Sequence, residues 1–342
     1  TNTGNAKIII VVAKCPDLTK IPGGSVFIYL TPDDKGLVIS RAYEKFGMRG
    51  SIVSELMFNN IKVSHDRIIG QPGKAIQQFN KLVDSGRLGV AAVAYAILEK
   101  AYRLLIFECK LNLIKKVNPG FIKRIKSALF VMEAIMAIGS SSHDYRLPDS
   151  VLYTALTKIY CTETSWQFLQ EMSDYFNIDA FSKNYHIFQL FRETTILRIT
   201  EGPNDVLIYR TGIDLITSSI INYSGEPEIK KFVDTDFFAY AERFDSALKK
   251  FSQMIIEVKD STVNFSQNQL VLNKVTQAAK HLYIMFACLL YYSRKMGSIQ
   301  NIPGIKPAII DNMTYTFNNA GERLNVIMDN KYNSLDEYYI LY

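Results

Sequence analysis

The pattern of apolar and polar positions changes once along the chain, just after residue 73. Before this point, short runs rich in β-branched residues alternate with turn residues, which predicts strands at 7–13, 25–30, 37–40 and 52–63. After it, apolar residues recur every three to four positions, as they do in amphipathic helices. The pattern therefore predicts a β region up to about residue 70, followed by helices.

The first half of the helical region has the spacing of four helices. The first helix is expected to begin at residue 75. The other three are expected at 121–138, 151–172 and roughly 205–221, and Asp149 or Ser150 is expected to cap the helix at 151–172. The first helix is expected to pack through its large apolar residues, while small residues between them let another helix approach. The large residues are Phe79, Val83, Val90, Val93 and Ile97, and the small ones are Gly86, Gly89, Ala91 and Ala92.

The last hundred residues have the most regular pattern of the chain. Apolar residues alternate four and three positions apart in three segments, 237–258, 271–296 and 310–327. This spacing is typical of helices that pack side by side along an apolar seam. The segments therefore predict a small antiparallel bundle of three helices.

The composition is typical of a soluble globular protein, with 48% apolar and 21% charged residues among 342. The formal net charge is +6, but no run of five or six like charges occurs, so we expect no nucleic-acid partner. The four cysteines and four histidines lack metal-ligand spacing, which predicts no metal site and unpaired thiols in a reducing compartment. Phosphate-loop, dinucleotide-binding, zinc-protease and serine-hydrolase motifs are absent from the sequence.

One carboxylate, Glu201, has a local setting that suits a general base. It ends the apolar run 196–199 and precedes a Gly-Pro turn and a helix, so its carboxyl group can be partly desolvated. Desolvation raises the pKa of a carboxyl group and makes it a better base near neutral pH. The alternative is an ordinary acid at a helix start, with Asn204 or Asp205 as the cap.

Arg87 is the second candidate, because it lies among small residues in the segment 85–92, Ser-Gly-Arg-Leu-Gly-Val-Ala-Ala. An arginine in such a helix is able to approach a ligand or a neighbouring helix closely. The alternative is a helix-interface residue whose aliphatic stem is buried and whose charge reaches solvent.

These segments also carry a resemblance that extends over essentially the whole chain. Residues 45–51 with 58–63 and 68–70 resemble the end of the middle β-domain of acyl-CoA dehydrogenases, and 85–92 resembles the first helix of their C-terminal domain. Residues 196–207 resemble the family segment that ends in Glu-Gly-Thr-Asn. Residues 269–272, 282–283 and 293–294 resemble the extra helical module of one branch, which contains very-long-chain acyl-CoA dehydrogenase and a paralogue that helps assemble respiratory complex I.

The resemblance implies an α+β fold with three parts. They are a partial middle β-domain (1–72), a helical bundle of the acyl-CoA dehydrogenase type with the catalytic glutamate (73–222), and an additional C-terminal helical module (223–342). It also implies that the sequence is the C-terminal part of the family chain.

The resemblance further implies a reaction, in which a glutamate removes the α-proton of a long-chain acyl-CoA thioester and the β-hydrogen leaves as hydride to FAD. It places the base at Glu201, with Arg87 beside it, and assigns Gly202 and Asn204 to cofactor binding. The implied partners are the acyl-CoA, electron-transferring flavoprotein, a second copy in a homodimer, and the mitochondrial inner membrane or complex I assembly factors. The implied location is the mitochondrial matrix or its inner membrane.

Several positions depart from the family pattern. The two flavin-contact motifs are expected near 108–113 and 173–180, but the sequence there has neither the Arg-x-Gln-Phe-Gly nor the Gln-x-x-Gly-Gly pattern. Pro203 replaces the threonine of Glu-Gly-Thr-Asn and has neither a hydroxyl nor an N–H group. The linker 218–236 is also shorter than the family's. The short linker argues against contact with a membrane. The loss of the two flavin motifs and of the threonine favours an alternative function, a catalytically degenerate scaffold in complex I assembly.

Overall fold

The computed structural model describes residues 2, 4–15, 24–111, 113–114, 116–147, 150–176, 185–218, 228–261, 265–298 and 304–329. Its strands lie in the first 70 residues. β1 (Ile9–Lys14), β2 (Ser25–Leu30) and β5 (Ile68–Ile69) form an antiparallel sheet with β2 in the middle. β3 (Leu37–Ala42) and β4 (Ser54–Phe58) form a separate antiparallel pair. A short 3₁₀ turn, η1 (His65–Arg67), precedes β5.

The helices begin at Ala75, so the predicted change from strands to helices is confirmed, and with it the α+β class. The first five are α1 (Ala75–Lys110), α2 (Pro119–Asp144), α3 (Ser150–Ser173), α4 (His186–Leu197) and α5 (Asn204–Thr217). The sequence pattern did not predict α4, whose 12 residues include a buried threonine among the apolar positions that face inward. Asp149, one of the two predicted caps of α3, and residues 219–221, predicted as the end of α5, lie outside the described residues.

The predicted buried face of α1 is wrong in part. Phe79 and Val93 are 44% and 41% exposed. Val90 is buried as predicted, and beyond it the buried apolar residues of α1 are three alanines and two leucines, Ala91, Ala94, Leu98, Ala101 and Leu105. α3 packs along this side of α1, and alanines allow the two helix backbones to approach closely. The small residues are therefore the packing surface rather than the gaps in it.

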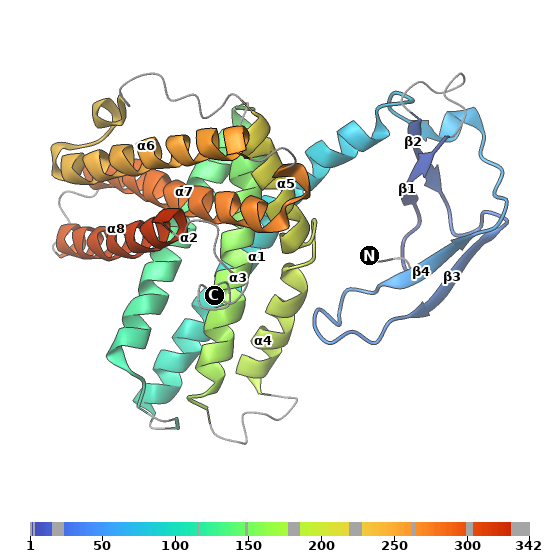
Figure 1. Cartoon of the computed structure of the whole chain (residues 1–342). Helices are drawn as coiled ribbons and strands as arrows, with labels where there is room; N and C mark the ends of the chain where they lie inside the picture. The colour runs from blue at the N-terminus through green and yellow to red at the C-terminus, as the bar shows by residue number, and fades with distance from the viewer. Residues whose placement is uncertain are drawn as a thin grey trace.

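The three C-terminal helices follow the predicted apolar seam. They are α6 (Phe238–Ser261), α7 (Gln269–Ser298) and α8 (Ile305–Asp329), with short 3₁₀ turns at η4 (Glu228–Phe232), η5 (Thr235–Phe237) and η6 (Phe265–Gln267). Figure 1 shows α7 between α6 and α8. The seam residues are buried in all three helices, including Phe244 and Phe251 of α6, Leu282 and Leu289 of α7, and Phe317 and Leu324 of α8.

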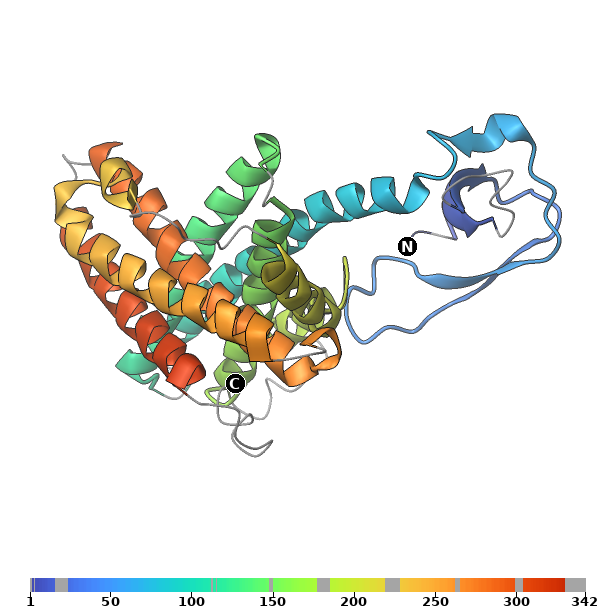
Figure 2. The same cartoon turned by 45° about the horizontal axis from the view of Figure 1, so that its top comes forward.

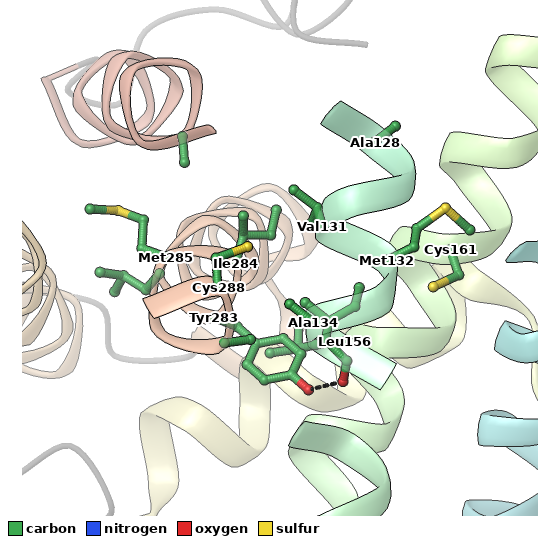
Figure 3. Close-up of a cluster of buried hydrophobic side chains, with 14 of the residues drawn as sticks. Ala128, Val131, Met132, Ala134, Leu156, Cys161, Tyr283, Ile284, Met285 and Cys288 are labelled. Atoms are coloured by element: carbon green, nitrogen blue, oxygen red, sulfur yellow. Dashed lines mark hydrogen bonds between the residues drawn. The ribbon is translucent and has the colours of Figure 1, made fainter. Parts of the chain in front are cut away.

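α7 also joins these helices to the first bundle in one continuous core. A Cβ atom on Gly212 of α5 would lie 2.6 Å from the carbonyl oxygen of Leu272, so only glycine permits this approach of α5 to α7. The Thr276 hydroxyl donates to the Ile208 carbonyl at 2.7 Å. Figure 3 shows Tyr283 of α7 pointing toward α2, where its hydroxyl donates to the Ile135 carbonyl at 2.8 Å.

The β region approaches the helices at two places. α1 extends from the bundle toward the strands, and the connection between β3 and β4 reaches α4 (Figures 1 and 2). At the second place the backbone N–H of Met48 donates to the Glu193 carboxylate of α4. Gly47 packs there against the backbone oxygen of Arg192, with no room for a side chain. The β region thus contacts α4 just before the turn that carries Glu201.

None of the described helices combines the length and apolar character that crossing a membrane requires.

Candidate active site

The turn between α4 and α5, residues 198–203, is called the Glu201 turn below. Glu201 has a backbone φ of +56° and Gly202 a φ of +98°, so both lie in the left-handed region. Glycine adopts this conformation readily, but a glutamate does so only where its surroundings hold it there. The strain at Glu201 marks the turn as a candidate functional site.

The Glu201 carboxylate is half-buried against α1, at Gly86. A Cβ atom on Gly86 would lie 2.7 Å from the Cδ atom of Glu201 and 2.8 Å from its Oε2 atom. The missing side chain at Gly86 is therefore the space that the carboxylate uses. Gly89, one turn further along α1, faces open space. α1 thus carries no side chain at these two positions, and the carboxylate occupies the space at the first of them.

Arg87 is buried, with 5% of its surface exposed, and its charge does not reach solvent as the alternative interpretation expected. Its Nη1 atom donates to Asp84 Oδ1 at 2.5 Å, and its Nε atom donates to the backbone oxygen of Glu201 at 3.3 Å. Burial raises the pKa of the Asp84 carboxyl, while the Arg87 guanidinium opposes this rise. Arg87 thus contacts the backbone of Glu201 rather than its carboxylate.

Lys158 of α3 lies beneath the turn and is fully buried. Its Nζ atom donates to the Arg198 carbonyl at 2.9 Å, to the Gly202 carbonyl at 2.8 Å and to Asn204 Oδ1 at 2.6 Å. Burial lowers the pKa of Lys158 to about 8, which the Glu163 carboxylate opposes. One ammonium group therefore bonds to both ends of the Glu201 turn.

The Asn204 side chain is 6% exposed and belongs to the same network. Its Nδ2 atom donates to Thr162 Oγ1 at 3.0 Å and to Glu163 Oε1 at 2.6 Å. Glu163 also accepts from Arg198 Nε at 3.0 Å, and the Arg198 guanidinium lies 4.6 Å from the centre of the Trp166 ring, a cation–π distance. Both amide hydrogens of Asn204 are used inside the protein, so its side chain fixes the start of α5.

The structure brings the four predicted site residues, Glu201, Arg87, Gly202 and Asn204, together at one place. The sequence analysis missed Lys158, Asp84 and Glu163, and it named Gly86 only as a small residue that lets a ligand or another helix approach. A signal for Lys158 exists, because Thr154, Lys158, Thr162 and Ser165 repeat at helical spacing and are all fully buried. A polar stripe of this kind on an otherwise apolar helix indicates a buried polar network.

The segments expected to carry flavin contacts have other surroundings. Glu108 of α1 is 7% exposed and accepts a hydrogen bond from the Tyr185 hydroxyl. Asn112, in the first of the two segments, and residues 177–180, in the second, lie outside the described residues. Within the described part of the chain, no group of three or more His, Cys, Asp or Glu side chains is placed to hold a metal ion.

The known proteins to which the chain is similar include acyl-CoA dehydrogenases. The chain is 25% identical over 223 residues to the mitochondrial very long-chain specific acyl-CoA dehydrogenase of Mus musculus, covering 60% of this chain and 33% of the relative. It is 26% identical over 216 residues to a short-chain specific acyl-CoA dehydrogenase of Clostridium acetobutylicum, which covers 60% of this chain and 56% of that relative. Its fold is similar to that of a Bacillus anthracis acyl-CoA dehydrogenase complexed with FAD, with a TM-score of 0.78 at 14% identity, covering 96% and 61%. No family model matches.

The chain therefore has the α+β fold of an acyl-CoA dehydrogenase, with a small β region and a helical bundle. The homologues and the fold neighbours together support the acyl-CoA dehydrogenase family for this chain. Mitochondrial very long-chain and bacterial short-chain members match at nearly the same identity, so the branch stays a prediction. The chain spans about a third of the length of the mitochondrial relative that it matches.

Proposed function

We propose that the protein is an FAD-dependent acyl-CoA dehydrogenase in which Glu201 removes the α-proton of an acyl-CoA thioester. The observation that carries the proposal is the Glu201 carboxylate itself. It is half-buried, it is presented from a strained turn, and it lies against a glycine that leaves room for it. A side chain held in this way suits a reaction that needs one positioned base.

The described residues fit FAD on the side of the base. The Glu201 carboxylate fills the space at Gly86, but Gly89 has open space around it, so a flat group or an acyl chain is able to approach α1 there. The Gly202 carbonyl and the Asn204 side chain, which were expected to contact the cofactor, are bonded to Lys158 instead. This chain's described residues thus supply the base and its support rather than the polar contacts to a dinucleotide.

When bound, FAD would accept the β-hydrogen with its electron pair, which leaves a double bond between the α and β carbons. The Glu201 carboxylate takes the proton from the α carbon of the same carbon–carbon bond. Arg87 holds the Glu201 backbone oxygen, and Lys158 holds the carbonyls on either side of the turn. The carboxylate thus keeps one position while the proton moves.

The finer parts of the proposal are supported by resemblance and by the names of relatives. Long-chain acyl-CoA as the substrate and mitochondria as the location agree with the mitochondrial very long-chain relatives. Electron-transferring flavoprotein as the electron acceptor and a homodimer follow from the family resemblance, as does contact with the mitochondrial inner membrane. The division into residues 1–72, 73–222 and 223–342 belongs to the same proposal.

A second candidate is a non-catalytic scaffold in complex I assembly. The observations that favour it are Pro203 at the position of the family's threonine, and the hydrogen bond from Tyr185 to Glu108 where a flavin contact was expected. It shares the fold and the Glu201 turn with the first candidate, but it needs no bound flavin.

The test is reduction of added FAD by a long-chain acyl-CoA, followed by the absorption spectrum of the flavin. Wild-type protein should reduce it, and Glu201→Gln should reduce it about 10²- to 10⁴-fold more slowly, because the base is lost while the volume is kept. Asp205→Asn is the matched control, since it removes an exposed carboxylate four residues further on. Equal rates for wild type and Glu201→Gln would place the base elsewhere. Binding of both ligands without any reduction by wild type would support the scaffold.

A further inference from the structure

Lys158 is a buried lysine whose hydrogen-bond partners are neutral groups. Burying a charge is costly, and a methionine of similar length would pack among apolar neighbours without that cost. Lys158 is fully buried, and its three acceptors are two backbone carbonyls and one side-chain amide oxygen. Stabilisation of the core alone gives no reason for a charge at this place.

The position of the three acceptors gives a reason for a charge on Lys158. Arg198 follows the last residue of α4, and its carbonyl is among those that the helix leaves without a partner inside itself. Outside the helix this carbonyl accepts from the Asn204 backbone N–H at 3.0 Å as well as from Lys158. The Gly202 carbonyl and Asn204 lie where α5 begins. An ammonium group has three N–H donors, so Lys158 is able to bond all three acceptors at once. Its positive charge also lies at the negative end of the α4 helix dipole.

The three bonds enclose the strained residue. Glu201 lies between the Arg198 and Gly202 carbonyls, so both backbone arms that lead to it are bonded to one atom of α3. Arg87 fixes the Glu201 backbone oxygen from the side of α1. A glutamate with a φ of +56° keeps this conformation only when its neighbours hold it.

We propose that Lys158 is the positioning residue that holds the Glu201 turn in its strained conformation and thereby aims the carboxylate. Its effect on catalysis rests on the proposed function, but its effect on the conformation of the turn does not. The charged groups around it are Glu163 on its own helix, Arg87 on α1, Arg198 at the end of α4, and Glu201.

The first experiment compares Lys158→Met with Lys280→Met by amide hydrogen exchange. Lys280 of α7 is a matched control, because burial lowers its pKa to about 8 as well and it lies outside the turn. Lys158→Met should increase exchange at residues 198–206 by tenfold or more, while Lys280→Met leaves these residues within twofold of wild type. An unchanged turn in Lys158→Met, or exchange that rises equally along the whole chain, would overturn the proposal.

The second readout is the rate of α-proton removal from an acyl-CoA, with its dissociation constant measured in parallel. Lys158→Met should lower the rate tenfold or more and leave the dissociation constant within twofold of wild type. A loss of binding with an unchanged rate would contradict a positioning role. If Glu201→Gln does not slow proton removal, the proposed function fails, and the hydrogen exchange still decides the role of Lys158.

The third measurement needs no variant and therefore stands even if Lys158→Met does not fold. A neutral amine has two donors for the three acceptors, so protection of residues 198–206 in wild type should fall as pH rises from 7 to 9, after correction for intrinsic exchange. The rest of the helical core should keep its protection over the same interval. Constant protection of the turn across this interval would contradict the proposal.

Discussion

The Glu201 turn and the seam of α6, α7 and α8 contrast in the contacts that define them. In the seam, the buried positions are apolar and each is in contact with several others, so a single position contributes by its volume. In the turn, a few polar atoms are held by specific hydrogen bonds, such as the three that Lys158 Nζ donates. A change in the seam is therefore expected to alter stability, whereas a change around the turn is expected to alter the position of one carboxylate.

The largest effect is expected in the seam, at Leu282. Leu282→Asp places a charge at a site that is 5% exposed and should lower the free energy of unfolding by about 4 kcal/mol. Ile256→Asp, on the outer side of α6 where the side chain is 51% exposed, is the control and should change it by about 0.5 kcal/mol or less. Chemical denaturation measures both variants. Equal stability of the two would mean that the seam is not core.

The second effect separates position from stability at the turn. Gly86→Ala adds a Cβ atom 2.7 Å from Glu201 Cδ, so the carboxylate must move. Displacement of a catalytic group by about 1 Å is able to cost roughly 100-fold in rate. The melting temperature should change little, because the displaced atoms are the end of a flexible side chain and alanine favours a helix.

Gly89→Ala is the matched control for Gly86→Ala, since its Cβ atom meets nothing within 4 Å. It should keep the rate of α-proton removal and stabilise α1 slightly, by about 0.5 to 1 kcal/mol. A rate that falls equally in both variants would show that α1, rather than the space beside Glu201, is what matters.

The smallest effect concerns pH. A rise in pH should lower the hydrogen-exchange protection of the Glu201 turn, but it should raise the free energy of unfolding of the whole molecule. Burial lowers the pKa of Lys158 and of Lys280 to about 8, from 10.5 in the unfolded chain. Between these values the unfolded chain binds more protons, so the free energy of unfolding should rise with pH. From pH 8 to 9.5 we expect a rise of about 1.5 kcal/mol for each of the two lysines, and Lys158→Met should remove the share of Lys158. Denaturation at several pH values tests this, and a fall over the interval would contradict it.

The same contrast explains how much of the molecule the sequence predicts. The seam was predicted at residue level because each apolar position repeats the same information at a fixed spacing, as in 271–296. The buried face of α1 was predicted wrongly in part, because periodicity does not show whether large or small residues face the neighbouring helix. α4 was missed because it has only 12 residues and its end was interpreted as part of the apolar run before Glu201.

The candidate site was predicted only in part for a related reason. Glu201 and Arg87 each stand out within their own segments. The partners of Lys158 lie 40, 44 and 46 residues further along the chain, and no local pattern connects them. Neither the left-handed conformation of Glu201 nor the space at Gly86 is visible without the neighbouring helix.

The most direct test of the central claim follows the proton that Glu201 is proposed to remove. An acyl-CoA is incubated with the FAD-loaded protein in deuterated water, and mass spectrometry measures deuterium at the carbon α to the thioester. Wild type should incorporate deuterium, and Glu201→Gln should do so about 10²- to 10⁴-fold more slowly, with unchanged melting temperature and acyl-CoA binding. Incorporation at the same rate in both proteins would contradict the account.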